Sequence, residues 1–203
     1  MPIATESRSR STDQRYYGVV EAIVTDVNDP EHEGRVKVTY PWFDDNTVSD
    51  WCRVRQLYAG PGYGTFFVPE KDDEVLVAFV HGDMTQPIVL GGLYNGNDKP
   101  SVYRDDQAKK DPKLIRTKGG QEILLDDSSG KEKIHIVDKA GNRIVIDAVA
   151  KTITVEANSN ITVQSKSGNV TVEAKGTLLL KGAAVNIEAS GAVTVTGSPI
   201  NLN

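Results

Sequence analysis

The chain has 203 residues, with 23 lysine and arginine residues against 28 aspartate and glutamate residues and a formal net charge of −5. This length allows one large domain or two small ones. The slightly acidic balance excludes a polybasic nucleic-acid binder and an acidic disordered tail. No apolar run reaches the roughly 18 residues of a membrane-spanning helix. Residues 1–15 are polar and lack the apolar core of a signal peptide, so we expect a flexible lead-in there and no cleaved signal.

Composition divides the chain into two parts. All 13 aromatic residues (4 Phe, 2 Trp and 7 Tyr) lie between Tyr16 and Tyr103. Residues 1–103 hold 9 basic and 16 acidic side chains, a net charge of −7, whereas residues 104–203 hold 14 and 12, a net charge of +2. We therefore expect two structural units, with the aromatic side chains filling the core of the first.

Cys52 is the single cysteine of the chain. One thiol cannot form an intramolecular disulfide or a cysteine-based metal site. We therefore expect Cys52 to be a small residue packed in a strand.

Residues 16–98 are predicted to be all-β, because apolar and polar residues alternate in short runs and no helical spacing persists. Val36, Val38 and Tyr40 share one face of a strand, as do Val75, Val77 and Phe79. Turn residues, including Asp44-Asp45-Asn46, separate the runs. The expected strands lie within residues 16–27, 34–42, 50–57, 64–69, 74–80 and 87–94. Such short strands favour a small closed barrel, which hides its strand edges.

Four segments of this region carry a family resemblance. They read YYGVVEAIVTDVNDPEHEGRVKVTYPWF, SDWCRV, FFVPEKDDEVLVAFVHGD and PIVLGGLYNGND. In order and spacing they resemble the OB-fold domain of contractile-tail spikes, a family that includes phage baseplate assembly protein V and the VgrG spikes of type VI secretion and extracellular injection systems. The resemblance implies an OB fold over residues 16–98 that docks on a separate hub protein.

Some OB folds bind nucleic acid, which requires a basic groove with aromatic platforms. Here the part of the chain that contains the aromatic residues is acidic. Counterion release cannot drive binding to such a surface, so we expect no nucleic-acid partner.

The second part of the chain is repetitive. Apolar residues two positions apart recur every seven to nine residues, separated by Gly, Asn, Ser or Ala, which suit tight bends. Threonines such as Thr171 lie between the two members of a pair and are expected to face solvent. The pairs are Ile153 and Val155, Ile161 and Val163, Val170 and Val172, Leu178 and Leu180, Val185 and Ile187, Val193 and Val195, and Ile200 and Leu202.

One copy of such a repeat buries too little apolar surface to offset the backbone entropy of folding. Three copies wound around one axis would bring the pairs together in a dry prism. The pairs Ile123/Leu125, Ile134/Ile136 and Ile144/Ile146 would lengthen that prism. This arrangement is similar to the intertwined triple-stranded β-helix of the spike family, and residues 117–147 resemble the VgrG region that begins the shaft. A monomeric β-solenoid is the structural alternative.

These observations predict a flexible lead at 1–15, an OB fold at 16–98, a connector at 99–118 and a β-helix shaft at 119–203. The expected trimer core of the shaft comprises Ile153, Val155, Ile161, Val163, Val170, Val172, Leu178, Leu180, Val185, Ile187, Val193 and Val195.

Catalytic and metal-binding chemistry is not expected. The acid pairs Asp105-Asp106 and Asp126-Asp127 are adjacent in sequence and suit solvated positions better than general acid–base work. The connector is too short for the lysozyme domain that some family spikes carry, and no His-x-His tip is present. His135 is expected on the outward face of its strand. We therefore predict no enzyme activity, no metal and no cofactor.

The resemblance implies a homotrimeric central spike of a contractile tail or injection-system baseplate that pierces the target envelope mechanically. The chain end, with Pro199, Ile200, Leu202 and Asn203, resembles a VgrG terminus and implies docking of a PAAR-type tip protein. Location in a virion tail or injection particle assembled in the bacterial cytoplasm is expected, with transient contact to the target membrane. The alternative function is a trimeric tail fibre that binds or cleaves a surface polysaccharide.

Overall fold

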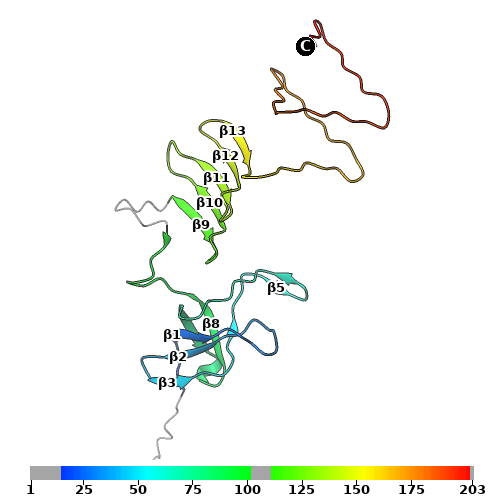
Figure 1. The fold of residues 1–203 in the computed structure, drawn as a ribbon. Coiled ribbons are helices and arrows are strands. Elements are labelled where there is room, and N and C mark those ends of the chain that lie inside the picture. Colours follow the sequence, from blue (N-terminus) through cyan, green and yellow to red (C-terminus); the bar gives the residue numbers. More distant parts are fainter. Residues whose placement is uncertain (1–14, 102–110, 202–203) are drawn as a thin grey trace, which may run out of the picture.

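The computed structural model describes residues 15–101 and 111–201, and its regular structure over these residues is β-sheet with little 3-10 structure. Two sheets account for most of the regular structure (Figure 1). None of the described residues belongs to a helix long and apolar enough to span a membrane.

The first sheet is six-stranded and curled, with the order β3-β2-β1-β7-β8-β4, which is consistent with the expected OB fold. Its neighbouring strands are antiparallel except for β4 and β8, which run parallel. An isolated bridge joins Val36 to Cys52, through two backbone hydrogen bonds of 3.0 and 2.7 Å, and draws the β2 and β4 sides of the sheet together. The strands are β1 (Val19–Asp26), β2 (Lys37–Tyr40), β3 (Asp44–Val48), β4 (Arg53–Val54), β7 (Glu74–Phe79) and β8 (Pro87–Gly92), with the 3-10 turn η1 (Val80–Gly82) between the last two.

The buried core of this barrel confirms the alternation in the sequence. Every second residue of β2 and β7 is buried, as the alternation of apolar and polar residues in these strands predicted. Cys52 is fully buried among them, as expected. The core residues are Ala22, Val24, Val36, Val38, Tyr40, Cys52, Val75, Val77, Phe79 and Val89.

The aromatic residues correct one expectation. Of the aromatic residues that the structure describes, only Tyr40 and Phe79 belong to the buried core, with ring centroids 5.7 Å apart. Tyr16 and Trp42 extend this cluster toward the surface, with centroids 5.3 Å apart. Most of the other described aromatic side chains are exposed, so core filling does not explain their concentration in this half.

Two local predictions were wrong. The turn expected at residues 44–46 belongs to β3, because the turn falls earlier, at Pro41–Phe43, where the Phe43 N–H donates to the Tyr40 carbonyl at 2.9 Å. The strand expected at 64–69 ends at Gly64. Beyond it, the Gln56 side chain bonds to both the N–H and the carbonyl of Phe67, at 3.0 and 3.2 Å, in the place of a neighbouring strand.

A short hairpin leaves the barrel between β4 and β7. It consists of β5 (Ala59–Gly60) and β6 (Tyr63–Gly64), which pair only with each other (Figure 1).

The second sheet is a five-stranded antiparallel meander in the order β13-β12-β11-β10-β9. Its strands are β9 (Pro112–Arg116), β10 (Glu122–Asp126), β11 (Lys133–Val137), β12 (Arg143–Asp147) and β13 (Thr152–Glu156). β9 lies within the segment for which we expected a connector; residues 102–110 of that segment lie outside the described residues.

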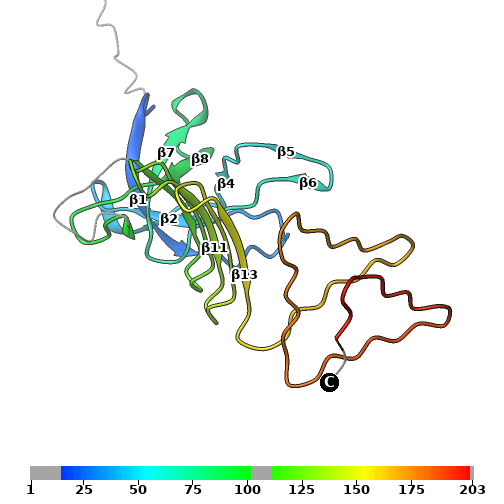
Figure 2. The ribbon, with the colours of Figure 1, turned by 90° about the horizontal axis from the view of Figure 1, so that it is seen from above.

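Beyond β13, the described residues 157–201 form no strand or helix. The chain there runs in extended stretches joined by bends (Figure 2). All of residues 158–201 are exposed. The triple-stranded shaft expected from the repeat is an interchain structure, and this single chain does not display it.

Candidate assembly face

One face of the second sheet is apolar and uncovered. The register places Ile115, Ile123, Ile136, Ile144 and Val155 in one row across the five strands. A second row runs parallel to it on the same face, two residues along each strand. It comprises Lys113, Leu125, Ile134, Ile146 and Ile153. Each of the nine apolar side chains in these rows is at least 40% exposed.

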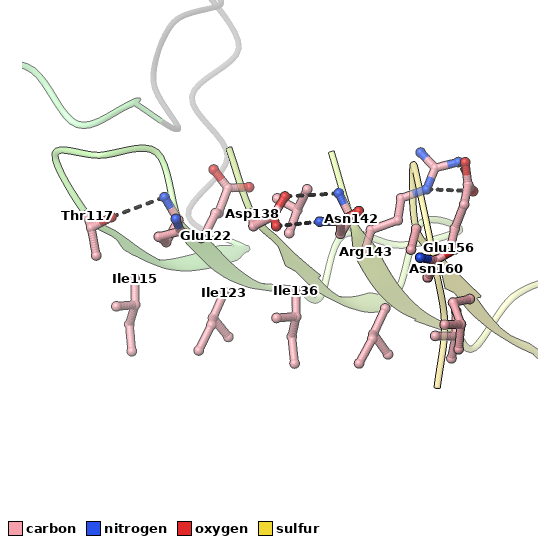
Figure 3. Close-up of a pocket in the computed structure, with 16 residues that line it drawn as sticks. Ile115, Thr117, Glu122, Ile123, Ile136, Asp138, Asn142, Arg143, Glu156 and Asn160 are labelled. Atoms are coloured by element: carbon pink, nitrogen blue, oxygen red, sulfur yellow. Dashed lines mark hydrogen bonds and ion pairs between the residues drawn. The ribbon is translucent and has the colours of Figure 1, made fainter. Parts of the chain in front are cut away.

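The first row lines a groove of about 540 Å³ (Figure 3). Figure 3 shows Ile115, Ile123 and Ile136 side by side and pointing the same way, while polar side chains gather along the ends of the strands. Ile161, just beyond β13, also lines this groove. The apolar rows therefore continue from the paired strands into the segment with no intrachain pairing.

The opposite face of the sheet is largely polar at both strand ends, while its central row comprises Leu114, Leu124, His135, Val145 and Thr154. Two ion pairs lie in one cross-strand row. Arg116 Nη1 is 3.6 Å from Glu122 Oε2, and Arg143 Nη2 is 2.7 Å from Glu156 Oε2. His135 lies on this face, opposite Ile134 and Ile136 of the apolar face, and its outward position in a shaft stays a prediction. Opposite charges that face each other across strands favour this register and suit a solvent-facing wall.

The turn between β11 and β12 is fixed by Asp138. Its carboxylate accepts hydrogen bonds from the Asn142 side chain at 2.7 Å and from the Ala140 and Asn142 N–H groups at 2.8 and 2.9 Å. These bonds hold the pKa of Asp138 below its ordinary value, and the bond from the Asn142 side chain has the largest effect. Gly141 adopts a φ of 87° in this turn, which a side chain would strain. The Asp138 carboxylate therefore stabilises this turn.

The structure brings some of the expected trimer-core residues together. Ile153 and Val155 lie on β13 and extend both apolar rows. Val155 and Ile161 share the groove with Ile144. The remaining residues are all exposed and are not gathered by this single chain: Val163, Val170, Val172, Leu178, Leu180, Val185, Ile187, Val193 and Val195.

The expected tip-docking residues are only partly described. Pro199 and Ile200 are exposed, and Leu202 and Asn203 lie outside the described residues. Their role stays a prediction.

Two features of the face escaped sequence reasoning. Ile115 was assigned to the connector, because residues 113–116 (Lys-Leu-Ile-Arg) show no alternation of apolar and polar residues. The charge rows were also missed, because they depend on which strands are neighbours. Within the described part of the chain, no group of three or more His, Cys, Asp or Glu side chains could hold a metal ion. The face offers apolar surface for association.

Comparison with known proteins finds a family match in the barrel and several relatives of the chain. Residues 20–94 match the family described as the type VI secretion system/phage-baseplate injector OB domain. The type VI secretion system spike protein VgrG3 of Vibrio cholerae is 36% identical over 111 residues, covering 50% of this chain and 11% of the relative. The spike protein VgrG1a of Pseudomonas aeruginosa is 33% identical over 113 residues, covering 51% of this chain and 18% of the relative.

A further relative has a toxin name. The actin cross-linking toxin VgrG1 of Vibrio cholerae is 33% identical over 113 residues, covering 52% of this chain. The match spans 10% of that toxin, and the matched segments cover between a tenth and a fifth of the length of these three relatives.

Proposed function

This chain belongs to the VgrG-like baseplate spike family, and we propose that it is a homotrimeric central spike. In the proposed spike, the barrel docks on a hub protein and the shaft pierces the target envelope. The injector OB domain and the VgrG relatives support a spike role in a type VI secretion system or a phage baseplate. The trimer, the docking and the piercing are our proposals.

The uncovered apolar face of the second sheet carries the proposal. Nine Ile, Leu and Val side chains in two neighbouring rows are each at least 40% exposed, and a contiguous exposed apolar patch of this kind is typical of an interaction surface. Three copies of the sheet, each forming one wall of a prism, would turn these rows inward and the charged rows outward. Five-residue strands at roughly 3.3 Å per residue give walls about 17 Å wide, which side chains from three directions can fill.

The exposed segment 158–201 supports the same conclusion. Its apolar pairs remain exposed within the described part of the chain. Ordering the backbone costs roughly 1 to 2 kcal/mol per residue, and this segment gains neither intrachain strand pairing nor burial in return. Winding with two further copies would supply both. The aromatic-free composition fits, since a narrow axial core has room for Val, Ile, Leu and Ala and little more.

Mechanical function follows from interchain pairing. In an intertwined shaft every strand is bonded to neighbouring chains, so no chain can peel away alone when the spike is pushed through an envelope. Unfolding under load is then governed by a high kinetic barrier. A hub protein and a PAAR-type tip protein are the proposed partners at the two ends.

The mass of the chain in solution tests this proposal most directly. Sedimentation equilibrium should give about 66 kDa, three times the 22.1 kDa of one chain. The trimer should also resist sodium dodecyl sulfate without heating. A single species of 22 kDa at micromolar concentration would contradict the shaft and the spike function together.

A further inference from the structure

The hairpin that leaves the barrel is the most apolar exposed feature of the first unit. Residues 57–67, which we call the arm, contain β5 and β6 and turn at Pro61 and Gly62. Figures 1 and 2 show the arm projecting from the curled sheet. Five of its large side chains are more than half exposed: Leu57, Tyr58, Tyr63, Phe66 and Phe67.

The arm has a defined shape. The Gln56 amide bonds to the main chain of Phe67 and also accepts from the Thr65 hydroxyl at 3.4 Å. The Thr65 N–H donates to the Tyr58 carbonyl at 2.8 Å. These bonds close the base of the arm, so its aromatic residues are presented on a fixed scaffold.

Glycines hold two of the aromatic rings together. The Tyr58 and Tyr63 ring centroids lie 5.1 Å apart. A side chain at Gly60 would collide with the Tyr63 ring, and one at Gly64, where φ is 143°, would collide with the Tyr58 carbonyl. Gly60 thus leaves room for the Tyr63 ring and Gly64 for the Tyr58 carbonyl, so that the exposed aromatic pair can form at the entropic cost that glycine carries.

Charge distinguishes the arm from the rest of the barrel. The arm has no charged residue, in a region of net charge −7. Arg53 and Arg55 precede it, are both exposed and form no ion pair within the described residues. An uncharged apolar arm beside two free cations complements an acidic surface with apolar patches, and the barrel itself has such a surface.

The base of the arm lies near one turn of the second sheet. Glu70, three residues beyond the arm, forms an ion pair with Lys118 in the β9–β10 turn, with Nζ and Oε2 3.6 Å apart. The base of the arm is therefore close to the β9–β10 turn of the sheet whose apolar face we propose to be covered by other copies. Within a trimer, the barrels of the other two chains would be tethered nearby at a high effective concentration.

We propose that the arm packs on the barrel of a neighbouring copy of this chain, with its aromatic side chains on apolar surface and Arg53 and Arg55 against acidic side chains. The inference rests on the proposed trimer. It extends the interchain contact from the shaft to the barrels. A contact between two different surfaces, repeated around a threefold axis, closes into a ring. The three barrels would then form one rigid platform.

Photo-crosslinking of the full-length protein tests this contact. Tyr63 is replaced by p-benzoylphenylalanine, which keeps an aromatic ring at an exposed position. Irradiation of the purified protein, followed by boiling in detergent, should give covalent species of two and three chains, with the attachment mapping to residues 15–98 of another chain. The matched control carries the same residue at Tyr94, which is exposed on the barrel outside the arm, and should give at least about fivefold less product.

The outcomes separate the two proposals. A protein that sediments as a trimer while the Tyr63 variant yields only single chains, or links no better than the Tyr94 variant, would overturn the arm contact and leave the spike intact. A monomeric protein would overturn both. Charge reversal gives a second readout: Arg53→Glu with Arg55→Glu should lower the Tyr63 crosslink yield by about fivefold or more, and an unchanged yield would contradict the proposed electrostatic contact.

Discussion

Asp29 and Arg35 form a two-point ion pair in the loop between β1 and β2. Arg35 Nη2 lies 2.8 Å from Asp29 Oδ1, and Nε lies 3.1 Å from Oδ2. The same carboxylate accepts hydrogen bonds from the N–H groups of Glu31, Glu33 and Arg35, at 3.1, 2.9 and 3.2 Å. Asp29 is 7% exposed, and its five acceptor contacts fix a loop in which His32 and Gly34 have positive φ.

This pair predicts acid sensitivity of the barrel. The Arg35 side chain, aided by the backbone bonds, holds the pKa of Asp29 well below its ordinary value. An unfolded chain then binds a proton at Asp29 more readily than the folded chain. The stabilisation is fully present above the unfolded pKa of about 4 and is lost as the pH falls toward the lowered folded value. Thermal melts should therefore show a midpoint that drops below about pH 4.

Replacement of Asp29 isolates this effect. Asp29→Asn removes the charge that Arg35 and the loop require, so its melting temperature should be lower at pH 7 and should fall less steeply below pH 4. The matched control is Glu33→Gln. Glu33 lies 3.3 Å from the same Arg35, but its side chain is 59% exposed, and exposed pairs contribute little. Equal losses in the two variants at pH 7 would show that Asp29 has no special role.

The reactivity of the Cys52 thiol can serve as a chemical probe of barrel folding. Its side chain is fully buried, and burial raises the pKa of its thiol. A buried, protonated thiol is a poor nucleophile. Labelling by a disulfide reagent at pH 7 should be slower than in the guanidinium-unfolded chain by on the order of a hundredfold or more. Rapid labelling of the folded protein would mean that the Val36 to Cys52 bridge opens readily.

The apolar rows predict which face of the second sheet assembles. Ile136→Asp would place three carboxylates inside the proposed prism, at a cost of roughly 3 to 5 kcal/mol per chain. The variant should sediment as a monomer, while Cys52 stays protected from labelling. His135→Asp, one residue away on the opposite face, should stay trimeric. If the two variants assemble equally well, the inward face has been misassigned.

The sequence predicted the barrel core well and the hairpins less well. Val36, Val38, Val75 and Val77 follow strict alternation, and burial on one face of a strand is what that alternation encodes. β3 and the end of β6 were misplaced because local bonds override propensity there: the Tyr40 to Phe43 turn in one case and the Gln56 side chain in the other. The periodicity of apolar residues in the sequence does not predict such local hydrogen bonds.

The assembly face was only partly predictable for a different reason. Pairs such as Ile144 and Ile146 show that one side of a strand is apolar, and this was visible in the sequence. That Ile144 lies opposite Val155 and Ile136 depends on strand order, which the spacing of pairs does not specify. The aromatic residues were misinterpreted as core because composition cannot distinguish a buried ring such as Tyr40 from an exposed one such as Tyr63.

A substitution at Gly64 tests whether the arm has a fixed conformation. Gly64→Ala forces a side chain into a φ of 143° and against the Tyr58 carbonyl, so the arm should lose its shape at a local cost of about 1 to 3 kcal/mol. Proteolysis at the arm should become faster, with Cys52 still protected. Gly91→Ala is the control, because that site has open space and no positive φ. Unchanged proteolysis in Gly64→Ala would show that the arm tolerates this strain.

Val172 provides the corresponding test for the segment beyond β13. Val172 is exposed in the single chain and is expected to face the axis of the proposed shaft, whereas its neighbour Thr171 is expected to face solvent. Val172→Asp should abolish the detergent-resistant trimer, because three uncompensated carboxylates would be buried together at a cost of several kcal/mol per chain. Thr171→Asp should keep it, because its carboxylates stay in water. A resistant trimer in Val172→Asp would mean that the repeats after β13 do not form the axial core, even if the five-stranded sheets alone hold three chains together.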